Sequence, residues 1–343
     1  MSTTPPGASS SVAEDPRPTL TLVIPIFNEQ ETIPELDRRL HAFLSDIGVS
    51  WEVVFVNDGS RDGSLALLQA LAKDERRYKI LSLSRNFGHQ VAITAGLDRA
   101  EGQAVVVMDA DLQDPPEVVR AMLDKWREGY DVVYGVRSQR RGETWFKRAT
   151  AAVFYRILRA MLGFSIPTDA GDFRLMSRLV VLTLRSLRER HRFIRGMVAW
   201  LGFRQTSVTY EREGRFAGET KYPFRKMMAF AIDGITSFSI VPLRIATWLG
   251  ALAGVLAIGV GVWALYQRLE GSVVPGWTTI MILVALGSSA QLLMTGILGE
   301  YVGRIYEEVK RRPLYAVAEE VNLGPPEREP QPRPPSPRGN PPF

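Results

Sequence analysis

The chain has 343 residues, no cysteine and three histidines, and its formal net charge is +5 at pH 7. A chain of this length can bury a large hydrophobic core and still carry further segments. Without cysteine it can form no disulfides, zinc sites built from thiolates or cysteine nucleophiles, and three histidines argue against a metal centre made of several histidines.

Both ends of the chain have the composition of disordered segments. Residues 1–18 hold four prolines among serine and threonine, and they lack the basic and apolar regions of a signal peptide. Residues 313–343 are expected to be a proline-rich tail, with nine prolines between 322 and 343.

Between residue 19 and about 137, apolar runs typical of strands alternate with segments typical of helices. The runs expected as strands are TLTLVIPIFN, WEVVFVNDGS, YKILSLS, AVVVMDAD and DVVYGVR. A capping box of Thr32 and Glu35 is expected to open the first helix, and Asp114 is expected to cap the fourth. Strands that alternate with helices of 10 to 15 residues predict an α/β fold with a parallel sheet.

Polar clusters follow three of these strands. They are PIFNE (25–29), NDGS (57–60) and DADLQ (109–113). Ligands of parallel sheets bind beyond the carboxyl ends of the strands, so we expect the three clusters at one edge. Asp109, Asp111 and Gln113 would project to one side as long as the chain stays extended. Two carboxylates this close repel unless a cation lies between them, and a solvated strand end is the alternative.

Neither a G-x-G-x-x-G nor a G-x-x-x-x-G-K-[ST] motif is present, so the usual backbone cradles for phosphate are absent. A metal on the aspartate pair would then have to neutralise a nucleoside diphosphate. Other polar residues fit two explanations. Asp58 stands one position past a buried strand, which favours ligand binding over the alternative of turn chemistry; turn chemistry accounts for Ser60 well enough to leave that residue out of the site. Asn86 and His89 suit a turn and a helix cap as well as ligand contacts.

The motifs PIFNE, VNDGSRDGS, SRNFGHQ, MDADLQDPPE and TDAGDFRLMSR together resemble the polyisoprenyl-phosphate glycosyltransferases, inverting enzymes of family 2 with a GT-A fold. The resemblance extends from about residue 19 to 312 and implies a catalytic domain over 19–230. It also implies that Asp109, Asp111 and Gln113 bind Mg²⁺ or Mn²⁺ together with the donor pyrophosphate. The positions that it assigns to the nucleotide sugar are Pro25, Phe27, Asn28, Glu29, Asp58 and Asp109.

Two later segments carry further candidates. Asp169 and Asp172 flank a glycine before an apolar run, as in a loop that enters a helix whose dipole favours carboxylates. The resemblance favours Asp172 as the acidic residue near the anomeric carbon of the sugar. The segment EREGRFAGETKYPFRK (211–226) resembles the R-x-x-G-x-[ST]-K motif of the family, which implies phosphate contacts for Arg215 and Lys221. A solvated basic linker is the alternative.

Two uncharged segments predict a membrane domain over 231–312. The first has 23 residues (245–267), and a stretch of 29 residues (271–299) contains the second expected span, at about 277–299. Each is long enough to cross roughly 30 Å of hydrocarbon. The flanking cations are Arg225, Lys226 and Arg244 before the pair, and Arg304, Lys310, Arg311 and Arg312 after it. The positive-inside rule therefore places the catalytic domain of a multi-pass inner-membrane protein in the cytoplasm.

A basic block lies between residues 137 and 159, with seven cations against one acid. Such a block suits nucleic acid or an anionic membrane surface. Residues 145–162 have the pattern of a basic amphipathic helix, and beside two apolar segments this pattern indicates an interfacial helix rather than a nucleic-acid site.

The sequence therefore predicts transfer of a hexose from a nucleotide sugar, expected to be a UDP-sugar, to undecaprenyl or another polyprenyl phosphate, with inversion. A processive polysaccharide synthase is one alternative, against which the Q-x-x-R-W motif is absent. A non-catalytic membrane scaffold is the other, although such a protein would be free to lose the aspartate pair. A homo-oligomer is compatible with the sequence.

Overall fold

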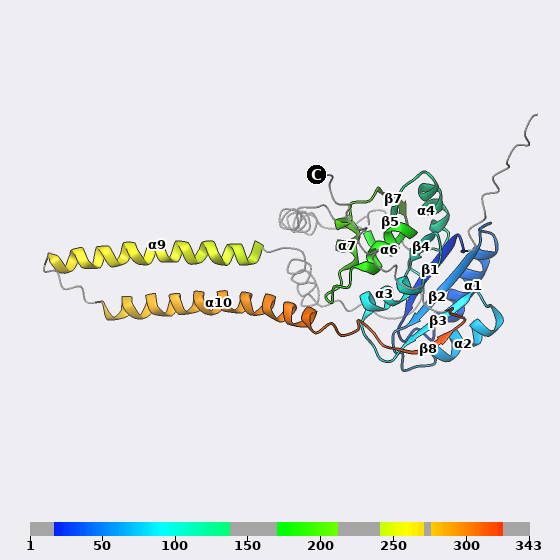
Figure 1. The fold of residues 1–343 in the computed structure, drawn as a ribbon, viewed down its shortest axis with the longest axis horizontal. Coiled ribbons are helices and arrows are strands. Elements are labelled where there is room, and N and C mark those ends of the chain that lie inside the picture. Colours follow the sequence, from blue (N-terminus) through cyan, green and yellow to red (C-terminus); the bar gives the residue numbers. More distant parts are fainter. Residues whose placement is uncertain (1–16, 138–169, 212–240, 271–275, 325–343) are drawn as a thin grey trace, which may run out of the picture.

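The computed structural model describes residues 17–137, 170–211, 241–270 and 276–324 (Figure 1). They form an α/β domain and a pair of long helices that extend from it. The strands are β1 (Leu20–Ile26), β2 (Trp51–Asn57), β3 (Tyr78–Leu83), β4 (Ala104–Val107), β5 (Val132–Arg137), β6 (Ala170–Ser177), β7 (Gln205–Tyr210) and β8 (Val317–Val321). The helices of the domain are α1 (Ile33–Ser45), α2 (Ser64–Asp74), α3 (His89–Arg99), α4 (Val118–Arg127), α6 (Arg178–Ser186) and α7 (Ile194–Trp200).

All eight strands belong to one sheet, in the order β7-β5-β6-β4-β1-β2-β3-β8. The central strands β3, β2, β1 and β4 are parallel, which confirms the expected α/β sheet. The sheet as a whole is mixed, because β6 runs antiparallel between β4 and β5, and β8 runs antiparallel to β3. The five strands expected between 19 and 137 are all present.

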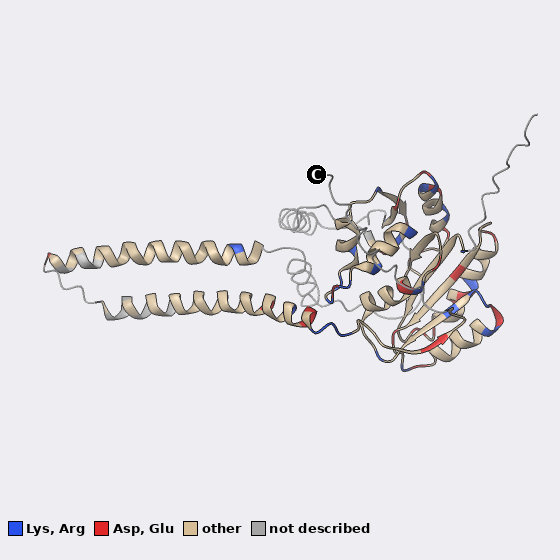
Figure 2. Ribbon diagram, viewed as in Figure 1, with Lys and Arg blue, Asp and Glu red and all other residues tan. Residues whose placement is uncertain are grey.

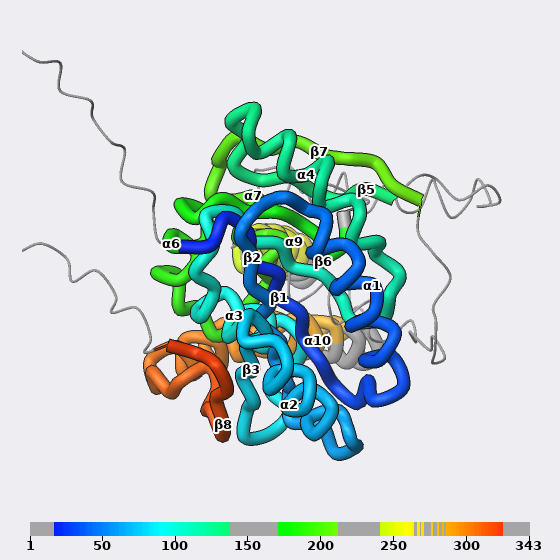
Figure 3. Tube along the Cα trace, turned by 90° about the vertical axis from the view of Figure 1, so that its right-hand side faces the viewer, coloured from blue at the N-terminus to red at the C-terminus, as the bar shows by residue number. Residues whose placement is uncertain are grey.

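The helices cover both faces of the sheet (Figures 1 and 3). Helices α1, α2 and α4 pack with one set of strand side chains, among them Leu22 and Ile24, and α3, α6 and α7 pack with the other set, which includes Val23. This division follows from the alternation of side chains along a strand. Because both faces are covered, strands such as β2 are apolar almost throughout and fully buried.

Three local expectations were wrong. Thr32 makes no capping hydrogen bond, and its hydroxyl donates instead to Glu29 (2.8 Å). Glu35 pairs with Arg38 (2.6 Å), so the capping box does not form. Asp114 does not cap α4, whose N-cap residue is Glu117; its carboxylate is buried and accepts a hydrogen bond from the Tyr210 hydroxyl.

The third wrong expectation concerns the segment around Asp172. Residues 170–177 form strand β6 rather than a loop that enters a helix, and α6 begins only at Arg178. Apolar Phe173 and Leu175 alternate with polar Asp172 and Arg174, as suits a strand whose two faces differ.

Strand β8 lies within the segment expected to be a proline-rich tail. It pairs with β3 at the edge of the sheet, and the Asn322 amide then donates to the carbonyls of Ala72 (2.7 Å) and Tyr78 (2.9 Å). The chain therefore returns to the α/β domain after the long helices.

Helices α9 (Val241–Leu269) and α10 (Trp277–Val309) run antiparallel and side by side (Figure 1). Among the described residues, one stretch, Val241–Trp263, is long and apolar enough to cross a membrane. Its mean hydropathy is 2.1, and 6% of it is buried inside the structure. The second expected span lies in α10, and its crossing stays a prediction. Both helices are almost free of charged residues along most of their length (Figure 2). They expose large apolar side chains such as Trp248 and Leu292, which indicates contact with something other than water.

Candidate active site

The loops after β1 and β2 are tied together at the carboxyl edge of the sheet. The backbone N–H of Asn28 donates to Ser60 Oγ (3.0 Å), and the backbone N–H of Arg61 donates to Asn28 Oδ1 (2.9 Å). Asn28 has a φ of 55°, a left-handed conformation that asparagine tolerates better than most residues. The first two polar clusters therefore form one surface, as expected from their positions after neighbouring parallel strands.

The residues assigned to the nucleoside lie along this surface in different environments. Pro25 is buried in β1 opposite Val56, whereas Phe27 is 44% exposed just beyond the strand. The Glu29 carboxylate accepts a hydrogen bond from the Thr32 hydroxyl. An exposed aromatic ring beside such polar groups could stack on a base, and contact with a nucleoside stays a prediction for all these residues.

Asp58 joins the loop after β2 to the loop after β3. Its buried carboxylate accepts hydrogen bonds from the backbone N–H groups of Phe87 (2.7 Å) and Gly88 (2.9 Å). Burial raises the pKa of Asp58, although the two backbone hydrogen bonds oppose the rise. Gly59 brings these loops close, since a Cβ there would lie 2.4 Å from the Arg85 carbonyl carbon. Asp58 therefore positions the start of α3, and its contact with nucleotide stays a prediction.

Asp109 and Asp111 follow β4 at the same edge. Oδ1 of Asp109 is buried and accepts no hydrogen bond from any described residue, while 30% of the side-chain surface is exposed. Burial raises the pKa of Asp109 to about 6; His89 opposes this rise, and Asp172 adds to it. Asp111 Oδ1 accepts a hydrogen bond from Gln113 N–H (3.2 Å). Between them, buried Leu112 has a φ of 58°, a strained conformation of the kind that clusters at functional sites.

The antiparallel pairing of β4 with β6 brings Asp172 to Asp109. Val107 lies opposite Arg174, so the same register extended by two residues puts Asp109 opposite Asp172. Asp169, which competed with Asp172 for this role, lies outside the described residues. Because a loop was expected here, the sequence did not predict that Asp172 lies next to Asp109. That placement depends on β6 lying between β4 and β5.

The Asp172 carboxylate is held by basic and polar side chains from three elements. Its contacts are Arg174 Nη2 (3.2 Å) and Arg195 Nε (3.1 Å) to Oδ1, and Gln90 Nε2, Arg195 Nη2 and His89 Nε2 (3.3 Å each) to Oδ2. Burial by itself raises the pKa of Asp172, but His89 and the two arginines outweigh it and hold the pKa well below its usual range. The carboxylate therefore stays ionised.

His89 lies between the two aspartates. Its Nε2 is 3.4 Å from Asp109 Oδ1 and 3.3 Å from Asp172 Oδ2, and 45% of its side-chain surface is exposed. Burial of the ring lowers the pKa of His89, but the hydrogen bond to Asp172 and the charge of Asp109 more than compensate, so the net shift is upward. Gln90 and Arg195 were not predicted as site residues, and His89 was left open between a helix cap and a ligand contact; the N-cap of α3 is Gly88. His89 and Gln90 stand within the SRNFGHQ motif, whereas nothing in the sequence around Arg195 distinguishes it.

The oxygen groups of this edge suit a divalent cation. A buried carboxylate oxygen without a hydrogen-bond donor is rare unless an ion or water satisfies it, and Asp109 Oδ1 is such an atom. In the described part of the chain, no three acidic or histidine side chains are spaced to hold an ion. Asp109, Asp111 and Gln113 would therefore need further oxygen ligands from a substrate. Arg215, Lys221 and the expected interfacial helix 145–162 fall outside the described residues.

Comparisons with known proteins show the family of the chain. Residues 21–184 match the family model "Glycosyl transferase family 2". An uncharacterized glycosyltransferase of Bacillus subtilis is 48% identical over 308 residues, which cover 88% of this chain and 94% of that protein. The bactoprenol glucosyl transferase of Shigella phage SfII is 40% identical over 299 residues, or 87% of this chain and 97% of that one.

Among solved structures, a mannosyltransferase from Pyrobaculum calidifontis in complex with GDP-Man and Mn²⁺ is 19% identical, with 80% of this chain and 87% of that chain covered and a TM-score of 0.42. That likeness is distant, and the sequence relatives decide the assignment. The resemblance found in the motifs is confirmed by relatives that align over most of the chain. The protein is a glycosyltransferase, and the chain belongs to glycosyl transferase family 2.

Proposed function

We propose that the protein transfers a hexose, with glucose as the first candidate, from a nucleoside diphosphate sugar to a polyprenyl phosphate at the cytoplasmic face of a membrane. The α/β domain would be a GT-A fold, the donor a UDP-sugar and the reaction inverting and metal-dependent. The observation that carries the proposal is the pair of carboxylates Asp109 and Asp172, both in contact with His89 at the carboxyl edge of the sheet. Relatives named bactoprenol glucosyl transferase support the choice of sugar and acceptor.

On the donor side, Asp109, Asp111 and Gln113 would hold Mg²⁺ or Mn²⁺. When bound, the cation would neutralise charge on the diphosphate that leaves with the nucleoside. Asp109 supplies a carboxylate oxygen that accepts no hydrogen bond from a described residue and has His89 Nε2 3.4 Å away, and Asp111 and Gln113 follow it around the turn at Leu112. Phe27, Asn28 and Glu29 would contact the nucleoside from the loop after β1, together with Pro25 and Asp58.

Asp172 would act by positioning other groups rather than as a base. Both of its oxygens already accept hydrogen bonds, and its pKa is held low, so it has little tendency to take a proton. It orients His89 and the guanidinium of Arg195, which is 34% exposed and thus accessible to a phosphate. The role near the anomeric carbon would therefore fall to the group that Asp172 holds in place.

The acceptor does not need a strong base. A phosphate monoester has a second pKa near 6, so it is largely a dianion at neutral pH. Its oxygen would form a bond to the anomeric carbon while the bond from that carbon to the donor diphosphate breaks, which inverts the configuration. The main barrier is repulsion between the two phosphate groups, which cations can lower. Arg195 would contribute to this, as would Arg215 and Lys221.

The acceptor would approach from the lipid. Arg244 near the start of α9 and Lys310 to Arg312 just after α10 lie at the domain end of the helical pair, because the two helices are antiparallel. Cations at that end fit a cytoplasmic domain by the positive-inside rule.

A donor screen tests this proposal. Purified full-length protein in detergent would be incubated with undecaprenyl phosphate, Mg²⁺ or Mn²⁺ and one radiolabelled nucleotide sugar at a time. We expect one labelled hexose to appear in the organic phase as a product that mild acid releases as a monosaccharide. Label in a water-soluble polymer would indicate a processive synthase, and no transfer from any donor would contradict the proposal.

A further inference from the structure

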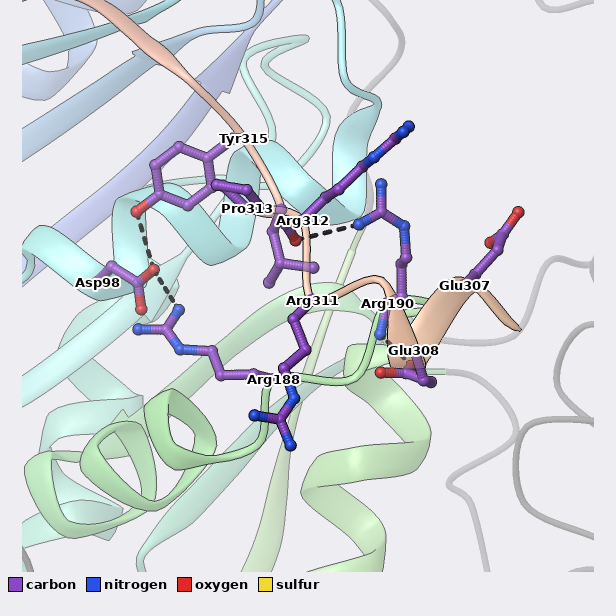
Figure 4. Close-up of a pocket in the computed structure, with 10 residues that line it drawn as sticks. Asp98, Arg188, Arg190, Glu307, Glu308, Arg311, Arg312, Pro313 and Tyr315 are labelled. Carbon is purple, nitrogen blue, oxygen red and sulfur yellow. Dashed lines mark hydrogen bonds and ion pairs between the residues drawn. The ribbon is translucent and has the colours of Figure 1, made fainter. Parts of the chain in front are cut away.

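An open pocket of about 670 Å³ lies where α10 ends and the chain returns to the α/β domain (Figure 4). Its walls come from the end of α3, the segment after α6 and residues 307–315. The residues that the argument uses are Asp98, Arg188, Arg190, Arg311, Arg312 and Tyr315. Four arginines line the pocket against three acidic residues.

The acidic residues of this pocket already have partners on its walls or next to them. Asp98 Oδ2 accepts hydrogen bonds from Arg188 Nη1 (2.8 Å) and the Tyr315 hydroxyl (2.9 Å), as Figure 4 shows. Glu308 accepts a hydrogen bond from the backbone N–H of Arg190 (2.6 Å), and Glu307 pairs with His191 (2.9 Å). These contacts fasten the end of α10 to the domain, and they leave Asp98 Oδ1 buried without a hydrogen-bond partner among the described residues.

The remaining cations have no such compensation. Arg190 Nη1 donates to the carbonyl of Arg312 (3.1 Å), a neutral acceptor. The side chains of Arg311 and Arg312 are exposed, and within the described ranges neither has a carboxylate partner. Arg311 has a φ of 47°, a conformation that a residue with a side chain rarely adopts. The backbone is therefore strained at the turn that carries these two arginines, whose side chains leave it in opposite directions (Figure 4).

The position of the pocket indicates which anion it meets. It follows directly on α10, whose last turns carry Tyr306 and, stacked on that ring at 3.9 Å from its centroid, Lys310. Aromatic and basic side chains at the end of an apolar helix are typical of the level of lipid headgroups. Guanidinium groups bind phosphate oxygens through paired hydrogen bonds.

The pocket is separate from the candidate active site. Asp98 follows His89 by nine residues along α3, and at 1.5 Å per residue this places the two about 14 Å apart along the helix. A phosphate bound in this pocket would thus lie too far from Asp109 to react with a donor there.

We propose that this pocket binds the phosphate group of an anionic membrane lipid, as a second lipid site that is distinct from the acceptor site. The inference rests on the membrane location given under the proposed function. A bound headgroup would join the turn after α10 to the segment that carries Arg190, and would fix how the catalytic domain meets the membrane.

The test is titration of the full chain in detergent, with bound lipid counted by native mass spectrometry. The probes are phosphatidylglycerol, phosphatidylcholine with the same acyl chains, and inorganic phosphate. We expect the wild type to bind one phosphatidylglycerol in preference to phosphatidylcholine, and the double variant Arg311→Gln/Arg312→Gln to weaken that binding roughly 30-fold. The control Lys73→Gln/Arg76→Gln removes two exposed cations from α2 and the turn after it, and should bind as the wild type does.

Three results would overturn the proposal: equal binding of the two lipids, unchanged binding by the Arg311/Arg312 variant, or displacement of the lipid by equimolar inorganic phosphate. The last would show a site for free phosphate. Glycosyl transfer in the same samples distinguishes this failure from failure of the proposed function. A wild type that makes lipid-linked hexose without preferring phosphatidylglycerol contradicts only the second site, and one that binds the lipid selectively but makes no product contradicts only the proposed reaction.

Discussion

A single carboxylate, that of Asp172, connects three elements of the domain. It is 10% exposed, and its charge is balanced by Arg174 on its own strand and by Arg195 on α7. Arg174 is 1% exposed, so it depends on Asp172 for an anionic partner. A buried pair of this kind adds little net stability when intact, but removal of one partner leaves an uncompensated buried charge.

We therefore expect Asp172→Asn to lower the free energy of unfolding of the α/β domain by about 3–5 kcal/mol, the range for breaking a buried ion pair. Arg195→Gln should cost clearly less, because Arg195 is 34% exposed and Arg174 still compensates Asp172. Urea unfolding followed by tryptophan fluorescence compares the two variants. Equal midpoints for Asp172→Asn and the wild type would contradict the role assigned to this residue.

Apart from residues that the family resemblance assigned, such as Asp172 within β6, the site residues found from the sequence directly follow strands. Asp109 and Asp58 could be placed at one sheet edge because parallel strands end there. The contacts to His89 and Arg195 could not be predicted from the sequence, since they depend on the register of β4 with β6 and on the packing of α3 and α7 against the sheet. Pairwise geometry of this kind arises from packing between elements and leaves no local pattern.

At the scale of elements, strands with strong apolar runs were predictable and strands at the margins were not. Strand β6 alternates polar and apolar residues, but Gly171 and the nearby aspartates favoured a loop. Strand β8 has the sequence VAEEV, and its charges suit an exposed edge while giving no strand signal of their own. What places β8 in the sheet is the free edge of β3, a property of the fold.

Helix α3 depends on a glycine for its close contact with the sheet. A Cβ on Gly96 would lie 2.3 Å from Val23 Cγ1 and 2.9 Å from Val56 Cγ2. Gly96→Ala should therefore push α3 outward and destabilise the domain by roughly 1–3 kcal/mol, despite the better helix propensity of alanine. Because His89 begins this helix, transferase activity should fall as well.

Thermal unfolding and activity of Gly96→Ala, compared with Gly324→Ala, measure this effect. A Cβ on Gly324 would meet nothing closer than 3.9 Å, so that variant should behave as the wild type does. Wild-type stability and activity in Gly96→Ala would contradict this prediction, because they would show that the packing of α3 accommodates a Cβ at this position.

At the scale of the whole molecule, the chain leaves the α/β domain for the helical pair and returns to it through β8. The return is secured by Asn322 on Ala72 and Tyr78 and by Tyr315 on Asp98. Helices α9 and α10, which expose large apolar side chains, extend away from the domain (Figure 1).

This arrangement gives a prediction for membrane topology. A protease added to sealed inside-out vesicles should digest the catalytic domain and spare a fragment that contains residues 245 to 298, because both ends of the helical pair would face the cytoplasm. Vesicles of the opposite orientation are the control. Protection of the domain in inside-out vesicles would reverse the orientation proposed here.

The most direct test of the account is formation of lipid-linked hexose by an Asp109 variant. Asp109→Asn keeps the shape of the side chain and removes the charge of the carboxylate whose Oδ1 has no described hydrogen-bond donor. The control is Asp46→Asn, an exposed aspartate that pairs with Arg120 on the surface. With purified protein, undecaprenyl phosphate, the donor found in the screen and a divalent cation, we expect the wild type and Asp46→Asn to form product at similar rates. Asp109→Asn should form it at least about 100-fold more slowly, with an unchanged melting temperature. Product formation by Asp109→Asn at the wild-type rate would contradict the assignment of catalysis to this edge of the sheet.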